Sequence, residues 1–382
     1  MFIGAYLEAA SHIFESYTLQ KPLYQFLKDF FRANKKFGSR DRKIISDLVY
    51  SVYRLGHENE IKSILEKLWA GAWLMKSFPA KYFSENYPLY FQQYELPLLD
   101  KLEVLKENGF IFNLPYALSH GLCEKDFFLN LFSRPKVFLR IRKNKQQIID
   151  RLREHNVNFQ VEHEHCISFS YQTNIEALLN AEDYVIQDMA SQQTGAYFKP
   201  QFKERWWDCC AASGGKALLL LDQERNIHLT VSDVRSTILE NLKSRLNIYG
   251  YRPAVLQVMD LMQPIPENFD SCFDAILADV PCSGSGTWAR SPEQYYFFTP
   301  EKLDLFQTKQ VKIVSNILSR LKPNGRLLYI TCSILNYENE AVLNRLKQLH
   351  AVNIHEQKIL NTFSKGGDAM FIAELSLNAQ SL

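Results

Sequence analysis

A regular alternation of strand-like and helix-like segments from about residue 186 onward constrains the fold more than any other feature. Apolar runs such as IHLTVSD, FDAILADV and GRLLYITCS have the pattern of strands, and STILENLKSRLNIYG and EKLDLFQTKQVKIVSNILSRL have the pattern of helices. Strands that are apolar almost throughout are buried on both faces. The alternation therefore predicts an α/β fold, with a parallel sheet covered by helices on both sides.

The chain before this region divides into two further parts. Residues 1–130 have helical periodicity, as in LYQFLKDFFRANKKFGSRDRKIISDLVYSVYRLG, where Ser39 is a candidate helix cap. Residues 131–185 contain a strand, KVFLRIRKN, a short amphipathic helix, QQIIDRLREHN, and a second strand, CISFSY. We therefore expect three domains: 1–130, which is helical, 131–185, which is a small α/β domain, and 186–382.

Composition limits the compartment and the partners. The net charge is only +2, so a nucleic acid would have to be bound by a local basic patch. The seven cysteines are an odd number without CxxC spacing, which favours a reducing compartment and predicts no metal site. The first residues, MFIGAYLEAASHIFESY, lack a basic leader, and no run approaches the roughly 20 apolar residues of a membrane span. We expect a cytoplasmic monomer with no membrane partner.

The stretch WWDCCAASGGKALLL puts a glycine turn directly after a strand and before a helix. A phosphate-binding loop for ATP needs GxxxxGK followed by Ser or Thr, but here Cys210 stands first and Ala217 follows Lys216. A dinucleotide fingerprint needs G-x-G-x-x-G, whereas this turn has only Gly214 and Gly215. Both ATP and a dinucleotide are therefore disfavoured.

Three aspartates end the strands that follow the turn. Asp233 comes 17 residues after Lys216, which is the usual place of a residue that binds ribose hydroxyls, and Asp260 could accept from an adenine amino group. Each aspartate alone, including Asp279, could simply cap a helix. Together they favour a cofactor with a ribose and a base but no phosphate, namely S-adenosylmethionine.

Two cysteines stand just beyond strands, in LADVPCSGSGTWARSPE and LLYITCSILNYENE. Cys282 and Cys332 are flanked by Ser and Gly in loops at the edge where the cofactor should bind. We interpret Cys166, Cys209 and Cys272 instead as small buried hydrophobic residues.

The motifs DCCAASGGK, DVPCSGSG and YITCSI…ENE resemble the signatures of the RNA 5-methylcytosine methyltransferases of the RsmB/Nop/Sun group. VIQDMASQQTGAYFKP and GGDAMFIAEL are similar to that family's entry segment and closing strand. FGSRDRKIISDLVYSVYRLG is similar to its NusB-like helical RNA-binding domain. The resemblance implies a Rossmann-like class I methyltransferase domain, preceded by a NusB-like helical region and a small RNA-binding domain.

The resemblance also implies roles for individual residues. Cys332 would be the nucleophile that adds to carbon 6 of cytosine, Cys282 would assist breakdown of the adduct, and Asp279 would bond the cytosine edge. The thiolate is the reactive form of a cysteine, so a nearby cation or dipole must favour it at Cys332. Proline is usual in the family where Ser213 stands, which we expect to weaken cofactor affinity at most. The residues implied for the S-adenosylmethionine site are Cys210, Ala211, Ala212, Ser213, Gly214, Gly215, Lys216, Asp233, Asp260 and Asp279.

Basic residues gather in two stretches that could contact RNA, 32–43 and 134–145. In the second, Phe138 alternates with Arg140 and Arg142 and is followed by Lys143 and Lys145, as on a strand face that binds single-stranded RNA.

The favoured hypothesis is an S-adenosylmethionine-dependent RNA cytosine-5 methyltransferase acting on rRNA. The alternatives are a tRNA methyltransferase and a catalytically silent ribosome-assembly factor. A catalytically silent protein is disfavoured because both Cys282 and Cys332 are present. A dinucleotide oxidoreductase is disfavoured because the glycine fingerprint is missing.

Overall fold

The chain forms two compact units built from interleaved segments. The computed structural model describes residues 3–85, 87–170, 173–269 and 272–378. The first unit comprises Met1–Pro115, Cys123–Arg134 and Thr287–Thr299. The second comprises Tyr116–Leu122, Pro135–Gly286 and Pro300–Leu382. Short 3-10 helices occur in both, at η1 (His57–Asn59), η2 (Ala80–Tyr82), η3 (Thr194–Tyr197), η4 (Ser285–Thr287), η5 (Asn336–Glu338) and η6 (Phe363–Lys365).

The first unit is helical, as the periodicity of its sequence predicts. Its helices are α1 (Ile3–Ser16), α2 (Leu23–Ala33), α3 (Ser39–Arg54), α4 (Ile64–Leu74), α5 (Pro88–Gln92), α6 (Leu98–Glu107), α7 (Glu124–Leu131) and α12 (Pro292–Tyr296). In α3, Ile45, Leu48, Val49 and Val52 are spaced along one helical face, and all four are fully buried. That apolar face forms part of the core of the unit.

The N-terminus of α3 is capped by an aspartate and not by the predicted serine. Ser39 is the first residue of the helix, after the N-cap Gly38. The carboxylate of Asp41 accepts a hydrogen bond from the Gly38 N–H at 2.8 Å. The prediction for Ser39 was therefore wrong, because an acidic side chain in the first turn satisfies the free backbone donor in its place.

The segment Thr287–Thr299 belongs to the helical unit although it lies far along the chain. Trp288 is buried, with its ring centroid 6.1 Å from that of Phe127. Tyr296 of α12 packs edge-to-face on Tyr53 at 5.4 Å. These residues lie inside the range 186–382 that the sequence assigns to one domain, and the three-domain division stays a prediction.

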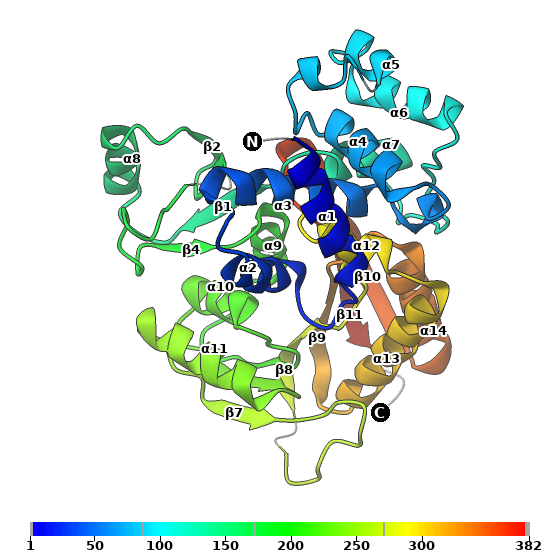
Figure 1. Cartoon of the computed structure of the whole chain (residues 1–382). Coiled ribbons are helices and arrows are strands. Elements are labelled where there is room, and N and C mark those ends of the chain that lie inside the picture. The colour runs from blue at the N-terminus through cyan, green and yellow to red at the C-terminus, as the bar shows by residue number, and fades with distance from the viewer. Residues whose placement is uncertain (1–2, 86, 171–172, 270–271, 379–382) are drawn as a thin grey trace. The chain divides into compact units, whose positions relative to one another are not determined.

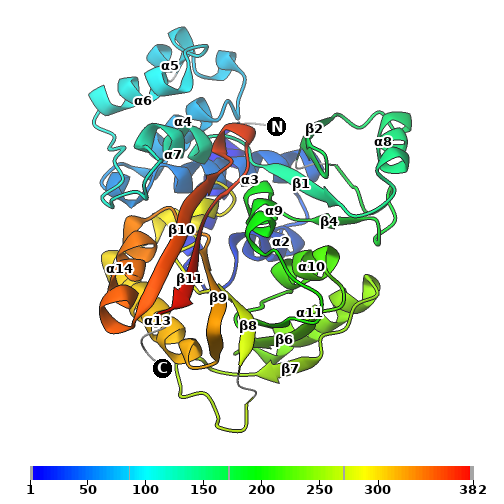
Figure 2. The ribbon, with the colours of Figure 1, turned by 180° about the vertical axis from the view of Figure 1, so that it is seen from behind.

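A seven-stranded sheet organises the second unit. Its order is β10-β11-β9-β8-β5-β6-β7, which Figure 2 shows from behind. The strands are β5 (Arg205–Asp208), β6 (His228–Asp233), β7 (Val255–Val258), β8 (Phe273–Asp279), β9 (Leu321–Thr331), β10 (Val352–Asn361) and β11 (Ala369–Leu377). Strands β5 to β9 run parallel to one another, whereas β11 pairs antiparallel with both β9 and β10.

The predicted α/β class is confirmed, but the prediction of a wholly parallel sheet was wrong at β10 and β11. The connection between these two strands is short, and a short connection allows only antiparallel pairing. β10 is largely exposed, so it lacks the continuous apolar pattern from which the other strands were predicted.

The two faces of the sheet are covered by different helices (Figure 1). Successive strand residues point to opposite faces, so Trp206 and Trp207 enter different core clusters. The Trp206 cluster includes apolar residues of α10 (Gly215–Gln223) and α11 (Ser236–Ile248), beside the short α9 (Met189–Gln193). The Trp207 cluster includes those of α13 (Pro300–Leu318) and α14 (Glu340–Leu349).

A smaller antiparallel sheet also belongs to the second unit. Its order is β2-β3-β1-β4, made by β1 (Lys136–Ile141), β2 (Phe159–His163), β3 (Cys166–Ser170) and β4 (Tyr184–Ile186). Helix α8 (Lys145–Glu154) buries Ile148 and Leu152 against Leu139 and Ile167 of the sheet. The predicted strand, helix and strand are confirmed here.

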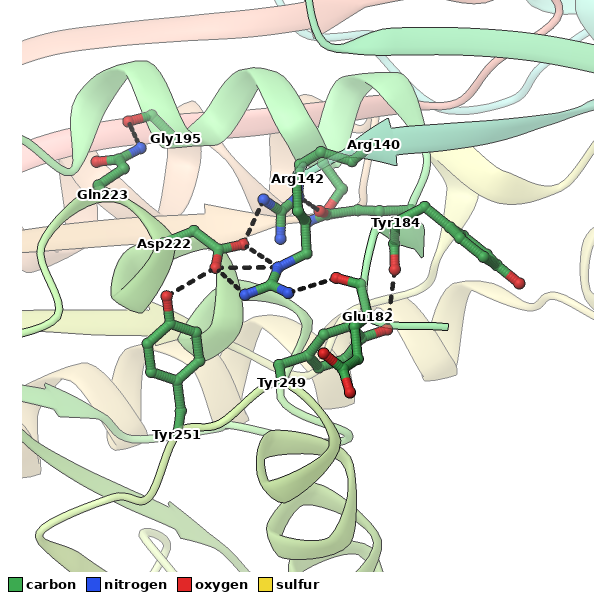
Figure 3. A network of polar contacts seen from close by, with 11 residues as sticks. Arg140, Arg142, Glu182, Tyr184, Gly195, Asp222, Gln223, Tyr249 and Tyr251 are labelled. Carbon is green, nitrogen blue, oxygen red and sulfur yellow. Dashed lines mark hydrogen bonds and ion pairs between the residues drawn. The ribbon is translucent and has the colours of Figure 1, made fainter. Parts of the chain in front are cut away.

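The arginines of β1 and its exit are structural and do not form the predicted RNA-binding face. Arg140 Nη1 and Arg142 Nη2 each lie 2.6 Å from a carboxylate oxygen of Asp222 in α10, and Figure 3 shows both guanidinium groups converging on it. The side chains of Arg140 and Arg142 are only 8% and 4% exposed. Tyr251 donates to the same carboxylate at 3.1 Å, and the Tyr249 ring lies 4.5 Å from the Arg142 guanidinium. The arginines therefore join the small sheet to α10, and the sequence could not show this because Asp222 lies far along the chain.

Removing this carboxylate is expected to destabilise the protein strongly. Asp222→Ala would leave two buried guanidinium groups without their counter-charge, at a cost of about 3–5 kcal/mol in the free energy of unfolding. Burial by itself would raise the pKa of Asp222, but hydrogen bonds and charges from Arg142 and Arg140 outweigh it and hold this pKa below its usual value. The stabilisation is therefore present above the unfolded-state pKa and is lost as the pH falls through the folded-state pKa.

Chemical denaturation of the variant measures this loss. The matched control is Asp150→Ala, which breaks the exposed pair of Asp150 with Arg153 and should cost less than about 1 kcal/mol. Equal losses in the two variants would contradict the structural role of Asp222.

Candidate active site

A row of carboxylates follows the C-terminal edge of the large sheet. Asp279, Asp208 and Asp233 end β8, β5 and β6, which are adjacent in the sheet, and Asp260 comes just after β7. In open α/β sheets this edge is the usual place of a ligand site. Asp233 and Asp279 stand at the strand ends where the sequence predicted them. Asp208 was missed, although it ends the first strand and begins the motif DCCAASGGK.

The turn between β5 and α10 has the backbone that the glycines predict. Gly214 has φ +80°, and a Cβ there would lie 2.8 Å from Leu242 Cγ, so no larger residue fits without displacement. The Ala212 N–H donates to Asp233 Oδ2 at 3.1 Å, which joins the turn to the end of the next strand. Ser213 is exposed and accepts a hydrogen bond from Arg245 through its backbone oxygen at 3.2 Å.

A buried lysine lies between the carboxylates and the thiols. Lys216 Nζ is 2.5 Å from Asp279 Oδ2. Burial alone would lower the pKa of Lys216, but the negative charges of Asp279, Cys332 and Asp208 outweigh burial and raise this pKa. Lys216 is therefore a fixed cation beside both Asp279 and the sulfur of Cys332.

Asp208 is a buried carboxyl group without an adequate partner. It is 1% exposed, and neither oxygen has a well-formed hydrogen bond within the part of the chain that the structure describes, although the Cys210 N–H is a weak donor toward it. Burial and, after it, the charge of Asp279 raise the pKa of Asp208 to about 7 against the opposite effect of Lys216. Such a group suits a ligand that brings a positive charge.

Substituting Asp208 by asparagine is expected to stabilise the ligand-free protein in alkaline solution. Because the pKa of Asp208 is higher in the folded than in the unfolded protein, protonation of this group contributes to the free energy of unfolding. This contribution is fully present below about pH 4 and is lost as the pH rises through about 7. Asp208→Asn keeps the shape of the neutral group, so the free energy of unfolding should exceed that of the wild type by about 4 kcal/mol near pH 9.

Thermal or chemical unfolding at acidic and alkaline pH checks this. Asp274→Asn is the control of opposite sign, because Lys322 Nζ holds the Asp274 carboxylate at 2.7 Å. If the wild type were as stable as Asp208→Asn at alkaline pH, Asp208 would not be a buried carboxyl group with a raised pKa.

The two loop cysteines come together at the same edge of the sheet. β8 and β9 are parallel neighbours, with Asp279 opposite Ile330, so the loops that follow them start side by side. The Sγ atoms of Cys282 and Cys332 are 3.2 Å apart, and both residues are half-buried. The hydrogen bond to Cys332 raises the pKa of Cys282, and burial raises it further. The protonated form of Cys282 is therefore favoured, and either sulfur can donate the hydrogen bond between them.

The remaining interpretations of the cysteines had different outcomes. Cys166 and Cys209 are buried, as the sequence predicted, but Cys272 is exposed, so that prediction was wrong.

In the described ranges no helix has both the length and the apolar character to cross a membrane. The same ranges hold no group of three or more His, Cys, Asp or Glu side chains placed to bind a metal ion.

Solved structures share this architecture. The crystal structure of PH0851 superposes with a TM-score of 0.71 over 97% of both chains, at 18% identity. A methyltransferase homologue from Pyrococcus horikoshii has a TM-score of 0.58 at 21% identity, over 68% of this chain and 92% of that chain. NSun6 from Pyrococcus horikoshii, solved with SFG, also has a TM-score of 0.58, at 14% identity, over 66% and 94%. These structures show that the chain has a Rossmann-like fold.

Sequence comparison finds a similarity to one family of methyltransferases. Residues 196–376 match the profile of the 16S rRNA methyltransferase RsmB/F family. Two proteins named ribosomal RNA small subunit methyltransferase B are similar to the chain: that of Salmonella arizonae is 33% identical over 169 residues, and that of Xylella fastidiosa is 32% identical over 163 residues. The similarity to the RsmB/F family is therefore carried by this part of the chain, which is just under half of its length.

The similarity is limited in extent. These two matches cover 44% and 43% of this chain and 39% and 38% of the relatives, so the chain spans about two fifths of the length of the curated relatives it matches.

Proposed function

We propose that the protein is an S-adenosylmethionine-dependent RNA cytosine-5 methyltransferase acting on small-subunit rRNA. The observation that carries the proposal is the pair of thiols 3.2 Å apart, beside a lysine–aspartate ion pair at the C-terminal edge of a Rossmann-like sheet. A simple hydrophobic role for cysteine does not require two half-buried sulfurs at this edge.

The chemistry of cytosine explains why two thiols are useful. Carbon 5 is a poor nucleophile until a thiolate adds to carbon 6, so we assign that addition to Cys332. A fixed cation favours the thiolate, and Lys216 supplies one. Asp279, whose side chain is 27% exposed and held by Lys216, would bond the cytosine edge near nitrogen 3.

Cys282 would complete the cycle. After methyl transfer, the proton on carbon 5 must leave so that the bond between Cys332 Sγ and carbon 6 can break and restore the ring. In the adduct the Cys332 sulfur is bound to carbon 6 and no longer raises the pKa of Cys282 by its hydrogen bond and charge. Cys282 would then give its proton to solvent and, as a thiolate, accept the proton from carbon 5, while the electrons of that bond expel the Cys332 sulfur.

The residues of the edge fit the methyl donor. Asp208 is a buried carboxyl group without an adequate partner and would bind the ammonium group of S-adenosylmethionine. The turn Cys210–Gly214 with Gly215 would hold its methionine part, Asp233 its ribose and Asp260 its adenine. When bound, this cofactor supplies the activated methyl group.

The helical unit carries a basic surface that suits RNA. Six basic residues of the stretch 32–43 are exposed: Arg32, Lys35, Lys36, Arg40, Arg42 and Lys43. We propose that this stretch, and not the buried arginines of β1, contacts the phosphate backbone. NusB-like RNA binding by residues 1–130 rests on this surface and on the sequence resemblance.

Release of tritium from RNA labelled at carbon 5 of cytosine tests the function. Transcripts of small-subunit rRNA and of tRNA are incubated with the whole protein and S-adenosylmethionine, and we expect tritium to appear in water from the rRNA. Transcripts labelled at carbon 5 of uridine serve as the control. Release from tRNA alone would favour the tRNA enzyme, and release from neither RNA would favour a silent assembly factor.

A further inference from the structure

A buried carboxylate lies behind the two thiols. Glu338, at the end of η5, is fully buried. Its oxygens accept hydrogen bonds from the Ser283 N–H at 2.7 Å, the Ser283 hydroxyl at 2.5 Å and the Ser333 hydroxyl at 2.5 Å. Gln310 of α13 donates a further hydrogen bond at 3.1 Å. Glu338 stands in the motif YENE, but none of the sequence predictions gave it a role.

Glu338 bonds two serines that each directly follow one of the two cysteines. Ser283 follows Cys282 in the chain, and Ser333 follows Cys332. One side chain therefore bonds the residues next to both thiols, from opposite loops. All partners of the Glu338 side chain are hydrogen-bond donors, and a carboxylate has more acceptor sites for them than any neutral side chain. Hydrogen bonds to a charged acceptor are also about twice as strong as those between neutral groups.

Burial raises the pKa of Glu338 above its usual value, and the hydrogen bonds from Ser283, Ser333 and Gln310 offset only part of this effect. Gln310 also donates to the Pro281 carbonyl at 3.0 Å, so the residue before Cys282 is held as well.

We infer that Glu338 is a positioning residue that holds Cys282 and Cys332 at the separation needed for adduct formation and release. This inference rests on the proposed function. Other contacts dock the two loops independently: the Gly286 N–H donates to the Cys332 carbonyl at 2.9 Å, and the hydroxyls of Ser285 and Ser333 are 3.0 Å apart. Loss of Glu338 should therefore disturb the thiols without separating the loops.

Steady-state kinetics give the first test. Oε1 of Glu338 accepts from the Ser283 N–H and from Gln310, and Oε2 accepts from the Ser283 and Ser333 hydroxyls. In Glu338→Gln an amide NH2 group replaces one of these oxygens, so two of the four donors lose their acceptor. A displacement of about 1 Å costs about 10²-fold in rate, so we expect kcat to fall by that factor. The KM values for RNA and for S-adenosylmethionine should stay unchanged, because Glu338 is buried away from both. Ser283→Ala and Ser333→Ala should each give a smaller fall.

Affinity for phenylarsine oxide gives a second test that needs neither RNA nor cofactor. Its arsenic forms bonds to two sulfurs, and the two thiol protons leave with its oxygen as water, so tight binding requires thiols held close together. The assay uses a Cys210→Ser background, because the sulfurs of Cys209 and Cys210 are 3.9 Å apart. Glu338→Gln should bind the arsenical more weakly, and Cys282→Ser should abolish the tight site.

A nearby buried glutamate provides the matched control. Glu340 accepts from the Ser119 hydroxyl at 2.9 Å and from the His120 N–H at 3.0 Å. Among the residues that the structure describes, it bonds neither Ser283 nor Ser333. Glu340→Gln should therefore keep the wild-type affinity for the arsenical.

The outcomes separate the inference from the proposed function. Wild-type arsenical affinity and wild-type kcat in Glu338→Gln would overturn the inference. If that variant does not fold, unchanged affinity in both Ser283→Ala and Ser333→Ala would overturn it, and weaker affinity in either would support it. A wild type that methylates no RNA, together with weaker arsenical binding in Glu338→Gln, would refute the proposed function alone.

Discussion

Cys332→Ala is expected to lose methyl transfer to cytosine by on the order of 10⁴-fold or more, as when the nucleophile of a covalent mechanism is removed. Without the sulfur, nothing adds to carbon 6, and carbon 5 stays too weak a nucleophile to take the methyl group. Binding of S-adenosylmethionine should persist, because the proposed cofactor residues lie on the β5 turn and at the ends of β6 and β7. Tritium release measures the first quantity, and calorimetric titration with the cofactor measures the second.

The control for this variant is another cysteine that lies outside the site. Cys123 is exposed, and its replacement by alanine should leave turnover unchanged. Substantial turnover in Cys332→Ala would remove this sulfur from the role of nucleophile, and the mechanism proposed above would fail with it.

Cys282→Ala should instead trap the protein on its RNA. Addition by Cys332 and methyl transfer can still occur, but the group that exchanges the proton is gone, so the bond between Cys332 Sγ and carbon 6 persists. Loss of an acid–base group typically costs 10²–10⁴-fold, roughly the expected fall in turnover. A band of protein joined to RNA, stable on a denaturing gel and dependent on S-adenosylmethionine, is the expected result.

The double variant Cys282→Ala, Cys332→Ala supplies the control, because it has no sulfur with which to form the adduct. It should show no band of joined protein and RNA. A single variant Cys282→Ala that turns over normally and leaves no adduct would show that another group releases the product.

The sequence predicted every strand of the large sheet except β10, and the edge at which the candidate site lies. Buried parallel strands have a local signature, and a glycine turn after the first of them marks the start of a ligand site. Because Cys282 and Cys332 each follow a strand by a few residues, and because β8 and β9 are neighbours, both thiols lie at one edge. The sequence itself does not show that these two strands are adjacent.

The predictions that failed concern partners from distant parts of the chain. The alternation in KVFLRIRKN correctly indicated a strand, but Arg140 and Arg142 were assigned to RNA because Asp222 was not known to face them. Cys272 was taken for a buried residue from its residue type alone. Asp208 and Glu338 were missed because their importance comes from burial, which single motifs do not reveal.

What the sequence determined by itself was local: strands, helices, a tight turn and the residues that immediately follow each strand, since φ/ψ preferences and hydrophobic spacing act over a few residues. The tertiary structure alone decided which groups meet: the two sulfurs at 3.2 Å, the lysine beside Asp279, and the arginines that share Asp222. The reason is physical, because charge, proton affinity and reactivity depend on the atoms within a few ångströms, and packing brings those atoms from segments that are far apart in the chain.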